Sequence, residues 1–186
     1  MKDARTVKEV MIPLSEYATV SEDATLYEAV LALEKAQEEF DETRFYKHRA
    51  ILIYDKNRKI VGKVSQLDVL RALEPKYEQM GDPNSLSRFG FSPQFLKSML
   101  QQFKLLEQPL ETLCKKAGAL KIKSFMYTPT AGEYVRASVT LNEAIHQLVM
   151  GHHQSLLVTE GGGIVGILRL ADVFREVCMI VKTGRP

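Results

Sequence analysis

The residues of this chain whose side-chain types could support catalysis or metal binding include its histidines and cysteines. His146, His152 and His153 lie close together in the sequence, but their spacing fits no metal-binding motif and no cluster of carboxylates accompanies them. Cys114 and Cys178 lie in separate segments, again without metal-ligand spacing. We therefore expect no metal centre, and free or buried thiols of a reducing cytoplasm rather than a disulfide.

A run of three glycines, Gly161-Gly162-Gly163, could cradle a phosphate group. A tight β-hairpin whose backbone needs positive φ explains the same run, and no helix follows it directly. The chain has no Gly-x-x-x-x-Gly-Lys-Ser/Thr motif and no Ser-His-Asp constellation. The sequence thus favours a protein that is not an enzyme.

Two aspartates, Asp68 and Asp172, each precede a short apolar stretch, Val69-Leu70 in one case and Val173-Phe174 in the other. Either aspartate could be the N-cap of a helix, because its carboxylate can accept hydrogen bonds from the first backbone N–H groups. Both also stand at the same place in a repeated pattern. A shared binding role therefore stays open beside the capping role.

The elements around these aspartates occur twice. Thr25-Leu26-Tyr27-Glu28-Ala29 and Thr140-Leu141-Asn142-Glu143-Ala144 match at an offset of 115 residues. Ile60-Val61-Gly62 and Ile164-Val165-Gly166 match at an offset of 104, as do the two aspartates. The change of offset places 11 extra residues in the first copy, around residues 38–46. A duplication of this kind predicts two copies of one small fold about a pseudo-twofold axis, with clefts between them.

Each copy is predicted to contain a leading segment, a strand, a helix, two strands and a last helix. Thr25-x-x-Glu28 and Thr140-x-x-Glu143 are capping boxes that open the first helix of each copy. Ser92-Pro93 and Pro109 open two helices between the copies. We predict repeats at 1–74 and 121–186 with a helical insertion at 75–120. The insertion either covers an outer face or a dimer interface, or acts as a lid or effector-docking element.

Composition limits the partners of the protein. The net charge is +2, with 45% apolar and 26% charged residues, which is ordinary for a soluble globular protein. This balance gives little attraction to nucleic acid or to anionic membranes. No apolar run approaches the roughly 20 residues that span a bilayer, and the first residues lack the apolar core of a secretory signal. We expect a cytoplasmic protein that binds neither a membrane nor nucleic acid.

With these features in place, the chain resembles the CBS domain family, here as a tandem pair (a Bateman module). The family's pattern is a leading strand ending near Val-Met, a helix signature Thr-Leu-x-Glu-Ala, a strand ending in Asp, and Gly-apolar-apolar-Thr/Ser-x-x-Asp before the last helix. The first copy shows Val10-Met11, residues 25–29, Asp55 and Gly62-Lys63-Val64-Ser65-Gln66-Leu67-Asp68. The second shows Phe125-Met126, residues 140–144 and Gly166-Ile167-Leu168-Arg169-Leu170-Ala171-Asp172. The resemblance implies an α/β (α+β) fold of two CBS repeats, each a small sheet with two helices on one face.

The family binds adenosine compounds in clefts between the repeats, so the resemblance also implies binding residues. Asp68 and Ser65 match the ribose-binding positions of the first repeat, where a carboxylate can accept hydrogen bonds from both ribose hydroxyls. Asp172 matches in the second repeat, but Arg169 replaces the usual Thr or Ser. Arg169 would either fill the second cleft or recognise a phosphate.

The remaining candidate residues also follow from the resemblance. The basic position before the middle strand, which meets the phosphates, is Arg49 in the first repeat and His153 in the second. Backbone near Tyr17-Ala18 and Glu133-Tyr134 matches the adenine contacts. For Ser65 a plain strand-end hydroxyl, and for Arg49 a solvated side chain, are the alternatives.

The resemblance finally implies a function. Paired CBS domains are regulatory modules, so we expect a sensor of AMP, ADP, ATP or S-adenosylmethionine that forms a homodimer and signals to an unknown protein effector in trans. The alternative is a structural dimerisation module whose clefts hold no nucleotide. Arg169 and the large insertion favour that alternative.

Overall fold

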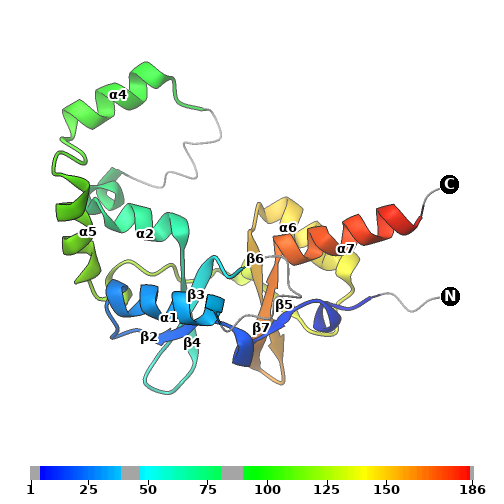
Figure 1. The fold of residues 1–186 in the computed structure, drawn as a ribbon. Helices are drawn as coiled ribbons and strands as arrows, with labels where there is room; N and C mark the ends of the chain where they lie inside the picture. The colour runs from blue at the N-terminus through cyan, green and yellow to red at the C-terminus, as the bar shows by residue number, and fades with distance from the viewer. Residues whose placement is uncertain (1–4, 39–46, 81–89, 185–186) are drawn as a thin grey trace.

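The computed structural model describes residues 5–38, 47–80 and 90–184, which form two small mixed β-sheets with helices packed against them (Figure 1). The strands are β1 (Ile12–Pro13), β2 (Thr19–Ser21), β3 (Ala50–Tyr54), β4 (Ile60–Ser65), β5 (Tyr134–Arg136), β6 (Ser155–Glu160) and β7 (Gly163–Arg169). The α-helices are α1 (Leu26–Glu38), α2 (Gln66–Ala72), α4 (Pro93–Gln102), α5 (Leu110–Gly118), α6 (Leu141–Gly151) and α7 (Leu170–Thr183). Short 3₁₀ segments are η1 (Val7–Glu9), η2 (Leu14–Glu16), η3 (Pro75–Met80), η4 (Ile122–Ser124) and η5 (Ala131–Glu133). The predicted fold class is confirmed.

The two repeats share one strand pattern. In repeat 1, β2 pairs in parallel with β3, which pairs antiparallel with β4, and in repeat 2 the strands β5, β6 and β7 do the same. Thr19 lies opposite Leu52, and Tyr134 lies opposite Leu157. The middle strands therefore match at an offset of 105 rather than 104. The sequence comparison, which matched Arg49 to His153 just before this strand at an offset of 104, was one residue out of register.

The leading segment of each repeat packs on the sheet of the other repeat. Strand β1 pairs antiparallel with β7, with Pro13 opposite Gly166. A Cβ atom on Gly166 would lie 2.4 Å from the carbonyl oxygen of Ile12, so glycine is needed for this close approach. Gly62 plays the same part in repeat 1, where a Cβ atom would lie 2.8 Å from Met126 Sδ. The repeated glycine thus allows the two halves to exchange their leading segments.

Local sequence signals begin and end the helices and hairpins. The Glu28 carboxylate accepts hydrogen bonds from Thr25 N and Oγ1 at the start of α1, as a capping box requires. Thr140 Oγ1 accepts a hydrogen bond from Glu143 N at the start of α6. Gly161 and Gly162 have φ angles of 60° and 83° in the loop between β6 and β7. The hairpin interpretation of the glycine run is therefore confirmed.

The apolar core has three parts. One cluster lies in each repeat, under α1 in repeat 1 and under α6 in repeat 2. A third cluster joins the two sheets in the middle of the molecule and consists of Ile12, Tyr17, Leu52, Leu157 and Ile167. Since Leu52 and Leu157 hold equivalent positions, the middle cluster lies on the pseudo-twofold axis that relates the repeats.

The insertion divides into two parts with different surroundings. Helix α5 packs against α1, and Ala117 joins the core of repeat 1. Helix α4 has no buried residue and stands away from the sheets in Figure 1. Of the 11 extra residues predicted in the first copy, residues 39–46 lie outside the described part of the chain.

Candidate functional site

The exchange of leading segments brings residues of both repeats together at two pseudo-equivalent places. Site 1 is the group Lys63, Ser65, Asp68, Tyr127, Gly132, Glu133 and His153. Site 2 is the group Tyr17, Ala18, His48, Ile167, Arg169 and Asp172. The strand registers make Ser65 equivalent to Arg169 and Lys63 equivalent to Ile167. Counted back from the 115-residue register of β2 and β5, Gly132 stands at the position of Tyr17 and Glu133 at that of Ala18, although Gly132 lies within η5 whereas Tyr17 follows η2.

Site 2 is filled by an ion pair. Arg169 Nε and Nη2 donate hydrogen bonds to the two carboxylate oxygens of Asp172, at 2.5 and 2.7 Å. Arg169 Nη1 donates a third hydrogen bond, of 3.2 Å, to the backbone oxygen of Lys47 in repeat 1. Only 7% of Arg169 is exposed. The carboxylate that was expected to hold a ribose is therefore held by this protein's own guanidinium.

Aromatic rings lie beside this ion pair. The Tyr17 and His48 rings are in edge contact, with 4.3 Å between their centroids, and both residues are buried. Burial raises the pKa of Tyr17 to about 12, while the charges of Arg169 and Asp172 act on it in opposite directions. Tyr17 and its buried neighbour Ala18, predicted as adenine contacts, thus belong to the same site as Asp172.

Site 1 carries a small residue where site 2 carries Arg169. Ser65 is the N-cap of α2, and its Oγ accepts a hydrogen bond from Asp68 N. Asp68 Oδ2 accepts hydrogen bonds from Ser65 N at 2.8 Å and Ser65 Oγ at 2.6 Å. Asp68 Oδ1 lies 3.7 Å from the guanidinium of Arg71. Asp68 is therefore the third residue of a capping box rather than the N-cap, and the N-cap alternative was wrong in detail for both aspartates.

A buried charged network adjoins Ser65 and Asp68 in site 1. Glu133, which is 3% exposed, pairs with Lys63 Nζ across the two repeats and accepts a 2.6 Å hydrogen bond from Tyr127 Oη. Thr130 N donates a further hydrogen bond of 3.0 Å. Burial alone would raise the pKa of Glu133, but the hydrogen bonds from Lys63, Tyr127 and Thr130 outweigh it, and the pKa is lowered.

Tyr127 connects this network to Asp68. Burial and then the hydrogen bond to Glu133 raise the pKa of Tyr127 to about 12, and the negative charge of Asp68 adds to the effect. The backbone of Tyr127 also pairs with Lys63 through two hydrogen bonds of 2.9 Å. The leading segment of repeat 2 is thus fixed to β4 within a short distance of Ser65.

The histidines before the middle strands occupy equivalent places. The 105-residue offset makes His48 the counterpart of His153, so the expected match of Arg49 with His153 is corrected. His153 Nε2 would lie 3.8 Å from a Cβ atom on Gly132, as the His48 ring lies beside Tyr17. Arg49 is exposed and precedes Ala50, the register partner of Ser65.

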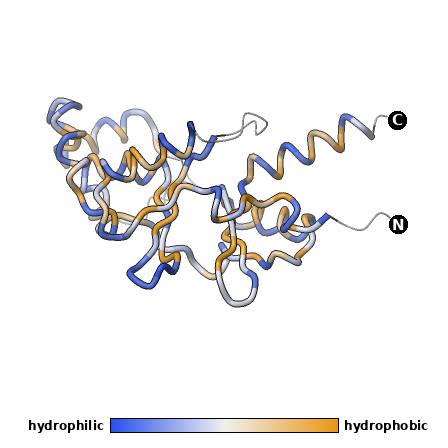
Figure 2. The backbone as a smooth tube through the Cα atoms, turned by 60° about the horizontal axis from the view of Figure 1, so that its bottom comes forward, coloured by the Kyte–Doolittle hydropathy of each residue, from blue (hydrophilic) through white to orange (hydrophobic). Residues whose placement is uncertain are grey.

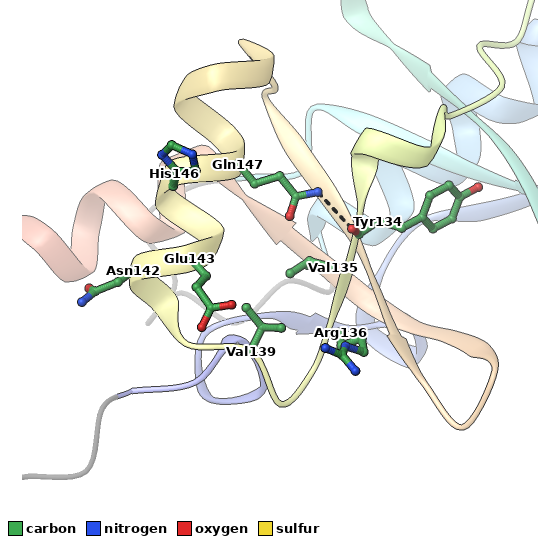
Figure 3. Close-up of a pocket in the computed structure, with 8 residues that line it drawn as sticks. All are labelled: Tyr134, Val135, Arg136, Val139, Asn142, Glu143, His146 and Gln147. Carbon is green, nitrogen blue, oxygen red and sulfur yellow. Dashed lines mark hydrogen bonds between the residues drawn. The ribbon is translucent and has the colours of Figure 1, made fainter.

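A groove of about 610 Å³ lies elsewhere, between α6 and β5 (Figure 3). Gln147 and His146 line it from the helix, and Tyr134 and Arg136 line it from the strand. Of the predicted binding residues, Tyr134 lines this groove. Gln147 Nε2 donates hydrogen bonds to the backbone oxygens of Gly132 and Tyr134, so the wall of the groove is tied to the backbone of site 1.

Neither a metal site nor a membrane-spanning helix is found among the described residues. No group of three or more His, Cys, Asp and Glu side chains within residues 5–38, 47–80 and 90–184 could hold a metal ion. In the same part of the chain, no helix has both the length and the apolar character needed to cross a membrane.

Sequence reasoning missed Lys63, Tyr127 and His48 and assigned Glu133 only a backbone role. One signal was present: Lys63 is a charged residue in the first apolar position of the Gly-apolar-apolar-Ser pattern. A buried lysine needs a partner, because an unpaired buried charge is costly. The partner, Glu133, lies 70 residues away, and only the exchange of leading segments brings the two together.

Comparisons with known proteins show the repeated domain and its fold. The family model for the CBS domain matches the chain twice, at residues 7–75 and 122–178. No curated protein sequence matches the chain. Solved structures do match, and the similarity extends over most of both chains.

CBSX2 from Arabidopsis thaliana, a CBS-pair protein, is 19% identical with a TM-score of 0.59, and the match covers 96% of this chain and 98% of that one. A structure of CBSX2 in complex with AMP is 20% identical with a TM-score of 0.57, covering 95% and 98%. The CBS domain of a membrane protein from Sphaerobacter thermophilus is 19% identical with a TM-score of 0.59, covering 92% and 87%. At these identities the likeness concerns the fold.

Proposed function

Because the chain belongs to the CBS domain family and carries the domain twice, we propose that it is a regulatory module that binds an adenosine-containing ligand between its repeats. The ligand class is AMP, ADP, ATP or S-adenosylmethionine. The carrying observation is the Ser65–Asp68 arrangement at the start of α2, with a carboxylate where the family holds ribose hydroxyls. The AMP complex of CBSX2 supports the same ligand class.

The proposal assigns separate tasks to the residues of site 1. Asp68 accepts hydrogen bonds from the ribose hydroxyls, and Ser65 adds a hydroxyl contact. The absence of a side chain at Gly132 leaves room for the adenine beside His153. Arg49, exposed beside the end of β4, meets a phosphate. No residue is given a catalytic role, since ligand binding changes the relative packing of the repeats rather than a covalent bond.

Dimerisation is a further part of the proposal. The helices expose large apolar side chains, among them Tyr27 and Leu31 on α1, Leu70 on α2, Met150 on α6, and Phe174, Ile180 and Val181 on α7. In Figure 2 apolar and polar positions alternate along the helix that leads to the C-terminus. Two copies would cover these faces, and an effector protein would read the state of the dimer in the cytoplasm. Both cysteines are free, which suits a reducing compartment.

The experiment that tests the proposal measures the melting temperature against AMP, ADP, ATP, S-adenosylmethionine, NADH and cyclic dinucleotides. A ligand at one hundred times its Kd stabilises the folded state by about 2.7 kcal/mol, which corresponds to roughly 5–10 °C for a chain of this size. Asp68→Asn should reduce the shift at the same ligand concentration to about half or less. No shift with any of these compounds would refute the proposal.

A second candidate function rests on the ion pair in site 2. A structural dimerisation module needs no ligand. The pairing of Arg169 with the Asp172 carboxylate, at the position expected to bind a ribose, is what such a module would show. Sedimentation velocity with and without the ligand panel separates the two functions. A dimer that forms without ligand, together with no ligand-dependent stabilisation, would support the structural module.

A further inference from the structure

Arg169 holds the position that Ser65 holds in site 1. Both residues are the N-cap of the last helix of their repeat, and both lie three residues before the aspartate. We infer that Arg169 is a built-in occupant of site 2, so that each chain binds a single adenosyl ligand, at site 1. This inference rests on the proposed function, and it names which of two related sites performs it.

The hydrogen bonds of Arg169 use the atoms that a ribose would need. Its guanidinium donates to both oxygens of Asp172 in a bidentate, charge-assisted pair, and its third donor is bonded to Lys47 O. A ribose could replace these bonds with neutral hydroxyl donors only. It would also leave a guanidinium that is 7% exposed without its anion, which is strongly unfavourable. Competition at Asp172 therefore favours Arg169 over a ligand.

Tyr17 fills a second part of the same site. It is 6% exposed and packs against His48, whereas Gly132, at the matching position counted from the strand registers, carries no side chain. A Cβ atom on Gly132 would meet its nearest neighbour, His153 Nε2, only at 3.8 Å. Two independent replacements, Ser by Arg and Gly by Tyr, thus fill the ribose and adenine positions of site 2 while site 1 keeps the small residues.

Arg169 also fixes the repeats to each other on the side of site 2. Its bond to Lys47 O joins the start of α7 in repeat 2 to the segment before β3 in repeat 1. A ligand at site 1 therefore acts on a module in which one of its two sites is already closed. Any ligand-dependent change in the module then comes from binding at site 1 alone.

Isothermal titration calorimetry with AMP tests the inference on the full chain. We expect one AMP per chain for the wild type, weakening by tenfold to a hundredfold in Asp68→Asn, since hydrogen bonds to a charged group are worth about 1.5–3 kcal/mol. Asp172→Asn should change the Kd by less than about twofold. The Arg169→Ser/Tyr17→Gly variant should bind two AMP molecules per chain, and adding Asp172→Asn should remove the second.

A matched control inserts the same occupant into site 1. Ser65→Arg should abolish AMP binding while the circular dichroism spectrum stays that of the wild type. Two AMP molecules per wild-type chain, or binding lost in Asp172→Asn and kept in Asp68→Asn, would overturn the inference and leave the proposed function standing. If neither the wild type nor the Arg169→Ser/Tyr17→Gly variant binds AMP, ADP, ATP or S-adenosylmethionine, the proposed function itself fails.

Discussion

Sites 1 and 2 are built on equivalent strands and helix starts of the two repeats, yet their ion pairs lie at different positions. Site 2 places its buried charge at the expected ribose position, where Arg169 pairs with Asp172. Site 1 has Ser65 at the corresponding position. Its ion pair, between Lys63 and Glu133, lies two residues earlier on the same face of β4. The counterparts of Lys63 and Glu133 in site 2 are the apolar residues Ile167 and Ala18.

The difference shows how two duplicated sites can diverge, with one retaining its ligand-binding residues and the other using them to stabilise the fold. A charged side chain joins the two halves on each side of the pseudo-twofold axis. On one side the ion pair Lys63–Glu133 links the repeats, and on the other Arg169, paired with Asp172 of its own repeat, donates a hydrogen bond to Lys47 O of repeat 1. In site 2 the ion pair engages the carboxylate that was expected to bind the ribose, that of Asp172. In site 1 the ion pair does not engage the corresponding carboxylate of Asp68. The same structural task is therefore compatible with ligand binding at only one of the two places.

The largest effect is expected from Glu133→Ala. Removing this carboxylate leaves the Lys63 charge buried without its partner and removes the acceptor of Tyr127 Oη. Breaking a buried pair in this way costs about 3–5 kcal/mol of unfolding free energy, which urea denaturation measures. The double variant Lys63→Ile/Glu133→Ala copies the residues of site 2 and should recover a large part of the loss. Equal destabilisation of the single and double variants would show that the ion pair does not set the stability of site 1.

A smaller effect separates two substitutions of Arg169. Arg169→Ser recreates the Ser-x-x-Asp capping box that opens α2, whereas Arg169→Ala leaves both the helix terminus and Asp172 without a side-chain partner at that position. A serine cap stabilises a helix by about 1 kcal/mol over alanine. Urea denaturation should therefore find Arg169→Ala less stable than Arg169→Ser by about that amount. Equal stability would indicate that the two helix starts are not equivalent.

The dependence of the unfolding free energy on pH, below pH 7, tests Glu133 in another way. Its pKa in the folded state is lowered below the ordinary value of 4.5, so its contribution is present above that value and is lost as the pH falls through the lowered pKa. The stability difference between the wild type and Glu133→Gln should be constant from pH 7 to about pH 5 and shrink below pH 4.5. A difference that does not change with pH would argue against a charged Glu133 in the folded protein.

Local chemistry determined which parts of this molecule could be read from the sequence. The capping residues Thr25 and Thr140, the glycine pair 161–162 and the helix start at Ser92 depend on neighbours within a few residues, and each forms as expected. The repeat itself was visible because both copies keep the same short signals. These features place Asp68 and Asp172 at the starts of their helices.

Contacts between distant segments could not be predicted from the same signals. Lys63 meets Glu133 because each leading segment packs on the other repeat, which no local pattern records. His48 was passed over because a one-residue shift in the middle strand moved the sequence match to Arg49. The sequence showed that Arg169 departs from the family pattern, and it offered two roles for this side chain, filling the cleft or meeting a phosphate. Choosing between them required knowing where Arg169 lies relative to Asp172 in the structure.

The smallest effect on stability is expected at Gly132, where the comparison of the two sites becomes sharpest. A Cβ atom there makes only an ordinary contact, 3.8 Å from His153 Nε2. Gly132→Ala should therefore change the unfolding free energy by less than about 0.5 kcal/mol. Gly132→Tyr copies Tyr17 into site 1 and should block AMP binding, because its ring would occupy the proposed adenine position beside His153, as Tyr17 packs beside His48. Calorimetry with AMP, run beside urea denaturation, measures both quantities. AMP binding that survives in Gly132→Tyr would mean that the ligand does not use the space in which the two sites differ most.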